Sequence, residues 1–290
     1  MSLMEECLRT HKWIAMDTEF PGSLRETSQN ATDQERYNDM RFSVGKTKVI
    51  QLGLTLFDVN GSIGGTWEIN FADFRETEDA RNEKSIGFLK RNGLDLKKIR
   101  EEGIGIRDFF LDLNMILKQT RNITWVTFHG SYDIAYLLKG LTGESLPVTS
   151  DRFSKSVARI LGSVYDLKVM ADRCNGLSSR LGLQSLANEV GLNCVGTAHH
   201  AGSDSELTAR VFAKICDNVG DSEGYIYGLG HRIISDRLKQ EAMMMHQMHM
   251  NHVMMMSRCY GPPPPPFPLR MPRFVSGYPP FGGLVLVPRV

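Results

Sequence analysis

Two acids stand at the end of an apolar stretch near the beginning of the chain. In the segment KWIAMDTEFPG, from Lys12 to Gly22, one residue separates Asp17 from Glu19. In a β-strand, alternate side chains share a face, so both carboxylates would point the same way, about 6–7 Å apart along the strand. Two like charges repel, and their burial costs several kcal/mol unless a cation compensates. The pair therefore predicts a cation site to which other parts of the chain contribute ligands.

Two further acids are predicted to face inward from helices. In FHGSYDIAYLLKGL, Asp133 lies early in a predicted helix, and Tyr136 follows on the same apolar face. In HHAGSDSELTARVFAKI, Ser203 and Glu206 have the spacing of a capping box, which predicts a helix from Ser203 with Asp204 in its first turn. Either acid alone could be a helix-start acid favoured by the helix dipole. Inward acids on one strand and two helices instead favour a shared site.

Converging carboxylates have the chemistry of a divalent metal site. The four acids are Asp17, Glu19, Asp133 and Asp204. Hard ions such as Mg²⁺ or Mn²⁺ prefer oxygen ligands, and two of them about 3.5–4 Å apart can activate water and neutralise a phosphodiester transition state. His199, five residues before Asp204, could deprotonate the attacking water, because imidazole exchanges protons near neutral pH. Adjacent side chains rarely face the same way, so we do not expect His200 to share this role.

Two residues beside the acids have alternative interpretations. Phe20 could stack on a nucleobase, or it could pack in the core on the strand face opposite Glu19. His129 lies one helical turn before Asp133, so it could border the site or satisfy the end of a strand. For His129 we favour the second interpretation.

The elements that would position these residues belong to a mixed α/β fold. The expected strands lie within 12–22, two around the turn at Asn60-Gly61 within 48–71, then 122–130 and 163–171. The expected helices are 85–92, 106–119, 131–139, 151–161, one within 183–191, and 203–220. Residues 23–43 read as polar and irregular. Three strands followed by strands that alternate with helices predict a mixed sheet with helices on both faces.

The composition changes near residue 240, which predicts a domain of residues 10–235 and a tail of residues 241–290. Residues 242–290 contain no Asp or Glu, most of the chain's 12 prolines and the block MMMHQMHMNHVMMM. Such a segment lacks the means to build a core, so we expect it to be disordered or extended. His246, His249 and His252 suggest a metal site, but no carboxylate or cysteine lies nearby in the sequence to complete one.

The whole-chain composition limits the class of protein. The chain has 290 residues, 41% of them hydrophobic, and a formal net charge of +1, so any nucleic-acid partner needs a local basic patch. Five cysteines without CxxC spacing favour a reducing compartment over a disulfide framework or a cysteine zinc site. No apolar run approaches the ~18 residues of a membrane span, and the N-terminus lacks the apolar core of a signal peptide. We therefore expect a cytoplasmic and nuclear protein without a membrane partner.

The spaced acids resemble those of a known enzyme superfamily. Asp-x-Glu, then Asp, then His-x4-Asp is the pattern of the histidine-type DEDD 3′–5′ exonucleases. The chain is more closely similar to the poly(A) deadenylase subunit of the Ccr–Not mRNA-decay complex, the Ccr-associated factor or Pop family. The blocks DTEFPG, VIQLGLTLF, WEINF, FHGSYD, YDLKVM, LQSLA, AGSDS and YGLG occur in that family's order, over about residues 10–230.

The resemblance implies a fold, an activity and partners. It implies an RNase H-like α/β fold and a poly(A)-specific 3′-exoribonuclease that uses two divalent ions and releases 5′-AMP. The metal-site acids of the family carry over to Asp17, Glu19, Asp133 and Asp204, and its general base to His199. The implied partners are the 3′ tail of mRNA, the Not scaffold and the Ccr-type nuclease. Residues 23–46 depart from the family pattern, with NDMRFSVGKTK (residues 38–48) in place of the expected stretch, and this difference concerns contacts at the substrate rim.

Two alternatives remain open at this point. The chain could be a DEDD exonuclease that acts on DNA or on short oligoribonucleotides. It could also be a catalytically weak scaffold or transcription cofactor of the same complex, although all five catalytic positions carry the expected residue types.

Overall fold

The computed structural model describes residues 1–174, 176–192, 198–216 and 221–260. The chain divides into two units, Met1–Met243 and Met244–Val290. The strands that the structure describes and all candidate site residues belong to the first unit.

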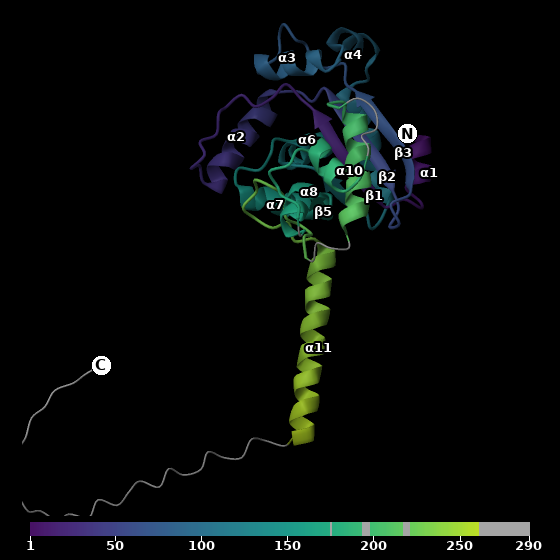
Figure 1. Ribbon diagram of the computed structural model, residues 1–290, viewed down its shortest axis with the longest axis vertical. Helices are drawn as coiled ribbons and strands as arrows, with labels where there is room; N and C mark the ends of the chain where they lie inside the picture. The colour runs from purple at the N-terminus through teal and green to yellow at the C-terminus, as the bar shows by residue number, and fades with distance from the viewer. Residues whose placement is uncertain (175, 193–197, 217–220, 261–290) are drawn as a thin grey trace, which may run out of the picture. The chain divides into compact units, whose positions relative to one another are not determined.

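A five-stranded mixed sheet forms the centre of this unit (Figure 1). The strand order is β3-β2-β1-β4-β5, and β1 pairs antiparallel with β2 and parallel with β4. The strands are β1 (Trp13–Glu19), β2 (Gln51–Phe57), β3 (Ile63–Asn70), β4 (Thr124–Thr127) and β5 (Ser163–Asp166). The mixed sheet predicted from the order of the elements is therefore confirmed.

Helices cover both faces of the sheet, as the two hydrophobic cores show. The helices of the first unit are α1 (Ser2–Cys7), α2 (Asp33–Lys46), α3 (Glu83–Arg91), α4 (Leu96–Glu102), α5 (Ile106–Gln119), α6 (Ser131–Thr142), α7 (Ser150–Ile160), α8 (Leu167–Arg173), α9 (Leu183–Glu189) and α10 (Ala201–Ile215). Ile14 and Met16 of β1 belong to the core that includes α2, α5, α6 and α7, whereas Ala15 belongs to the core with α8, α9 and α10. Since Asp17 and Glu19 alternate in register with Ala15, they share its side of the sheet, where α10 packs on β1 and β2.

The first turn of α10 is seated by residues that are distant in the sequence. A Cβ atom on Gly53 of β2 would lie 1.7 Å from the carbonyl oxygen of Ala201, so only glycine lets the helix approach the strand this closely. The side chains of Gln51 and Glu68 accept hydrogen bonds from the first backbone N–H groups of the helix, at Ala201 (3.4 Å) and Gly202 (3.2 Å). The helix therefore begins at Ala201, and the predicted capping box at Ser203 is wrong. Side chains of β2 and β3 accept the first N–H groups of the helix in place of a capping box.

Three other local predictions differ from the structure. Residues 23–43 were predicted to be irregular, but α2 (Asp33–Lys46) begins within them, at a capping box between Thr32 and Glu35. The predicted strand 163–171 stops at Asp166, whose side chain accepts the N–H of Lys168 (2.9 Å) and starts α8. The predicted tail from residue 241 is helical in its first part, within α11 (Asp236–Tyr260), and residues 261–290 lie outside the described residues. Within the described residues, no helix combines the length and apolar character needed to cross a membrane.

Candidate active site

The four predicted acids come from three elements of the first unit. Asp17 and Glu19 lie at the end of β1, Asp133 lies in the first turn of α6, and Asp204 lies in the first turn of α10. Asp133 and Asp204 are only 6% and 8% exposed, although both carry a carboxylate. The inward direction predicted for these two helix acids is therefore confirmed.

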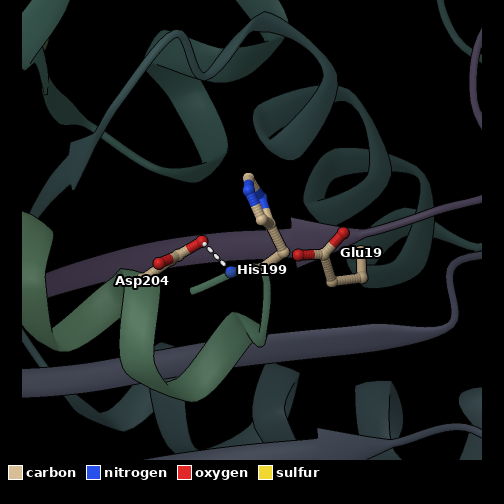
Figure 2. Close-up of side chains that lie close together, drawn as sticks. All are labelled: Glu19, His199 and Asp204. Carbon is tan, nitrogen blue, oxygen red and sulfur yellow. Dashed lines mark hydrogen bonds between the residues drawn. The ribbon is translucent and has the colours of Figure 1, made fainter. Parts of the chain in front are cut away.

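Glu19, His199 and Asp204 meet at one point. Their candidate ligand atoms all lie within 4.8 Å of one another, and Glu19 and Asp204 flank His199 on opposite sides (Figure 2). The backbone of His199 has a φ of 63°, a left-handed conformation that is uncommon outside glycine. In this conformation its N–H donates a 3.0 Å hydrogen bond to Asp204 Oδ2, drawn as a dashed line in Figure 2. The loop is thus tied to the acid that follows it in the helix.

Asp17 and Asp133 lie outside this three-residue group but interact with it electrostatically. Desolvation, followed by the charges of Asp133, Glu19 and Asp204, raises the pKa of Asp17 well above its ordinary value. The hydroxyl of Thr18, whose side chain lies on the opposite face of β1, donates a hydrogen bond to Asp133. The five predicted residues therefore occupy one neighbourhood, although only three of them bring ligand atoms together.

The pKa values of the other three carboxyl groups are raised as well. Desolvation and the charges of Asp204 and Asp133 raise the pKa of Glu19 to about 8. Desolvation, opposed by the Thr18 hydrogen bond, raises the pKa of Asp133 to about 7. Desolvation also raises the pKa of Asp204, although the backbone N–H of His199 offsets part of the effect. The pKa values of all four carboxyl groups are raised, which indicates that the protein itself supplies too little positive charge to stabilise their ionised forms.

A divalent cation is the group that this arrangement fits. Oxygen atoms of carboxylates are the ligands that hard ions such as Mg²⁺ and Mn²⁺ prefer. A bound cation would relieve the repulsion that raises the pKa values, because it favours the charged form of each acid. The donor set, its burial and its unrelieved charge together indicate an acidic metal site.

The two neighbouring histidines have different surroundings. The imidazole of His199 meets the edge of Phe88, with ring centroids 4.6 Å apart and an interplanar angle of 71°. His200 Nε2 lies 3.2 Å from the carbonyl oxygen of Asn92, and its Nδ1 lies 3.9 Å from the carboxylate of Glu68. A ring nitrogen of His199 lies within 4.8 Å of the ligand atoms of Glu19 and Asp204, whereas His200 is engaged with α3 and β3.

Several residues at the site were not found by sequence reasoning. Thr18 and Gln184, whose amide lies 3.5 Å from Asp204 Oδ1, contact the acids, and Phe88 contacts His199. A threonine between two acids on a strand was the one available signal, since Phe88 and Gln184 come from distant helices. Phe20 stacks on Tyr132, with centroids 5.0 Å apart and planes 8° apart, and packs against the core, which favours its core interpretation.

Comparison with known proteins places this geometry in context. Residues 1–110 match the family model described as CAF1 family ribonuclease. The chain is 74% identical to CCR4-associated factor 1 homologue 8 of Arabidopsis thaliana over 216 residues, 74% of this chain and 90% of that protein. It is 34% identical to the poly(A) ribonuclease pop2 of Schizosaccharomyces pombe over 244 residues, 79% of this chain and 71% of that protein. A structure of S. pombe Pop2p in a form with bound Mg²⁺ and Mn²⁺ superposes with a TM-score of 0.71 at 34% identity, covering 79% of this chain and 94% of that one.

Proposed function

Because the chain belongs to the family of CCR4-associated factor 1 (CAF1) ribonucleases, we propose that it shortens the poly(A) tails of mRNA. The reaction is metal-dependent hydrolysis from the 3′ end, and each turnover releases one 5′-AMP. The observation that carries this proposal is the convergence of buried acids and His199 at the end of β1. The similarity to a poly(A) ribonuclease supports the choice of substrate.

The acids hold the ions that the reaction requires. Asp17, Glu19, Asp133 and Asp204 would bind two divalent ions, Mg²⁺ or Mn²⁺, and the similar Pop2p structure was obtained with both kinds of ion. When bound, such ions lower the pKa of water and neutralise the charge of the phosphodiester transition state. The raised pKa values of these acids support the assignment, because a bound cation would stabilise the ionised carboxylates that now repel one another.

His199 acts as the general base. Its imidazole lies beside Glu19 and Asp204 and takes the proton of the attacking water. The water oxygen bonds to phosphorus, the bond from phosphorus to the 3′ oxygen of the preceding nucleotide breaks, and that oxygen leaves as a hydroxyl after protonation. The hydrogen bond from the N–H of His199 to Asp204 fixes the loop, so the ring is positioned before the substrate arrives.

The proposal extends to the assembly in which the enzyme acts. Its relatives are named as factors associated with CCR4, and we propose that this chain pairs with a Ccr-type nuclease and docks on the Not scaffold. We further propose that the protein acts in the cytoplasm and the nucleus, where the complex shortens the tails of mRNA.

A degradation assay tests the proposal. The chain is incubated with a 5′-labelled RNA that ends in 20 adenosines, with Mg²⁺ or Mn²⁺ and with or without EDTA. We expect products that shorten one nucleotide at a time from the 3′ end, release of 5′-AMP, and complete inhibition by EDTA. Unlabelled poly(A) should compete strongly and unlabelled oligo(dA) weakly. Strong competition by oligo(dA) would favour a DNA exonuclease, and no degradation at all would favour a scaffold.

A further inference from the structure

A cluster of aromatic and cationic side chains lies at the ends of β4 and β5, close to Asp133. The ammonium of Lys168 lies 5.4 Å from the ring centroid of Phe128 and 5.2 Å from that of Tyr227. The imidazole of His129 meets Tyr227 nearly at a right angle, with centroids 4.9 Å apart. We refer to Phe128, His129, Lys168 and Tyr227 as the Lys168 cluster. None of its members has a role in the hydrolysis described above.

One buried carboxylate holds the cluster together. Asp166 has no exposed surface, and it accepts backbone hydrogen bonds from His129 (2.9 Å), Gly130 (3.1 Å), Lys168 (2.9 Å) and Tyr227 (3.0 Å). These donors come from the β4–α6 turn, the start of α8 and the segment near residue 227. These bonds favour the charged form of Asp166, although its burial outweighs them and raises its pKa above the ordinary value.

The same carboxylate places the cluster beside the catalytic acids. Gly130 is the N-cap of α6, and Asp133 lies in the first turn of that helix. Asp166 therefore fixes the start of α6 and the Lys168 cluster through a single group. The charge of Asp166 also contributes to the raised pKa of Asp133, as expected for neighbours.

The cluster offers a surface on which RNA can lie. Tyr227 is 38% exposed, His129 is exposed, and Phe128 and Lys168 are half-buried. Among the residues that the structure describes, no carboxylate lies within 4.0 Å of the Lys168 ammonium, whereas Lys48, Lys90 and Lys155 each have such a partner. An unpaired cation between aromatic rings is the combination with which proteins bind single-stranded nucleic acid, since the rings stack on bases and the cation contacts phosphate.

We propose that the Lys168 cluster is the subsite for the nucleotide on the 5′ side of the scissile bond. Lys168 contacts its phosphate, and Tyr227 stacks against its base. The inference rests on the proposed function, because an enzyme that removes the 3′-terminal nucleotide leaves the rest of the RNA on the 5′ side of the acids. A site adjacent to Asp133, but separate from the ligand atoms of Glu19, His199 and Asp204, suits that upstream nucleotide.

Two variants remove the two contacts separately. Lys168→Met keeps the aliphatic stem but removes the charge, and Tyr227→Leu removes the ring. Lys155→Met is the matched control, because Lys155 is an exposed lysine of α7 paired with Asp151. Thermal unfolding establishes that each variant is folded, and Lys168→Gln and Tyr227→His replace either variant that is not.

The experiment compares two substrates. Oligo(A) of ten nucleotides spans the subsite, whereas the p-nitrophenyl ester of 5′-AMP contains only the nucleotide that is released. We expect the KM for oligo(A) to rise roughly 10-fold or more in each variant, and hydrolysis of the ester to stay within about twofold of the wild-type rate. The slope of log KM for oligo(A) against log salt concentration should fall by about one for Lys168→Met and remain unchanged for Tyr227→Leu.

Two results overturn the inference. One is a KM for oligo(A) within twofold of wild type in both variants, which would make the cluster structural or a contact for a protein. The other is an equal loss on both substrates, which would place the cluster at the released nucleotide.

A binding measurement separates this inference from the proposed function. Fluorescence anisotropy of labelled oligo(A), measured with Asp17→Asn as background, reports affinity without turnover. If the wild-type chain hydrolyses neither substrate, the proposed function fails. A 10-fold weaker affinity on adding Lys168→Met would still support the subsite, and an unchanged affinity would refute it.

Discussion

The substitution Glu19→Gln should stabilise the metal-free protein while it destroys the metal site. Glutamine keeps the shape of the glutamate side chain but carries no charge. The substitution therefore removes one negative charge from a site that contains three other carboxyl groups. The pKa of Glu19 is raised from 4.5 to about 8 in the folded protein. Above pH 4.5 the unfolded chain therefore releases the proton more readily than the folded chain does.

The sign and size of the effect follow from linkage. Because the folded pKa is raised, the stabilisation by protonated Glu19 is fully present below pH 4.5 and is lost as pH rises to about 8. Each pH unit within this window costs about 1.4 kcal/mol, so the wild-type protein loses roughly 3 kcal/mol between pH 4.5 and pH 7. Glu19→Gln escapes this loss. Its free energy of unfolding at pH 7 should exceed that of the wild type by up to about 3 kcal/mol, and the difference should vanish near pH 4.5.

Urea unfolding in EDTA at pH 4.5, 6 and 7 measures this difference. Glu26→Gln, which changes an exposed acid outside the site, is the matched control and should alter the free energy of unfolding by less than about 0.5 kcal/mol. Addition of Mn²⁺ should stabilise the wild type and the control but not Glu19→Gln, because only the intact site binds the ions. The reasoning is refuted if Glu19→Gln is no more stable than wild type at pH 7 without metal, or if its advantage persists at pH 4.5.

Three further predictions concern the base, the tail and the close approach of α10. His199→Ala should lower turnover on poly(A) by roughly 10²–10⁴, whereas His200→Ala should cost much less; a dead His200→Ala would reverse the assignment. A chain truncated after Met243 should unfold cooperatively and degrade poly(A) like the full chain, because the sheet and the candidate site lie in Met1–Met243. Loss of cooperative unfolding on truncation would contradict this prediction. Gly53→Ala should destabilise the protein by about 1–3 kcal/mol and displace the helix that carries Asp204, with matching loss of activity, because its Cβ would overlap Ala201. In contrast, Gly45→Ala in α2 meets no atom within 4 Å and should stabilise by about 0.5–1 kcal/mol, so equal effects of the two changes in urea unfolding would contradict the packing argument.

Local periodicity was sufficient to predict the elements that carry the acids. The alternation in β1 placed Asp17 and Glu19 on one face, and the apolar faces of α6 and α10 predicted that Asp133 and Asp204 would point inward. These inferences depend on neighbours within one element, which the sequence displays directly.

Contacts between distant segments explain what could not be predicted. The start of α10 depends on Gln51 and Glu68, about 150 and 134 residues earlier in the chain, so its own sequence suggested a cap that is not used. Asp166 was predicted to lie inside the strand 163–171. Its role could not be predicted, because its backbone donors come from segments that meet only in the folded protein. Its importance for the Lys168 cluster is visible only in three dimensions.

Equilibrium binding of Mn²⁺, followed by its electron paramagnetic resonance signal, tests the central claim most directly. The claim is that the carboxylates at the end of β1 converge to hold divalent ions, with His199 as base and not as ligand. The account predicts two Mn²⁺ ions per chain for the wild type and for His199→Ala, and fewer than two for Asp17→Asn and Glu19→Gln. The account is contradicted if the wild type binds no Mn²⁺ at millimolar concentration, or if the acid variants bind as many ions as the wild type.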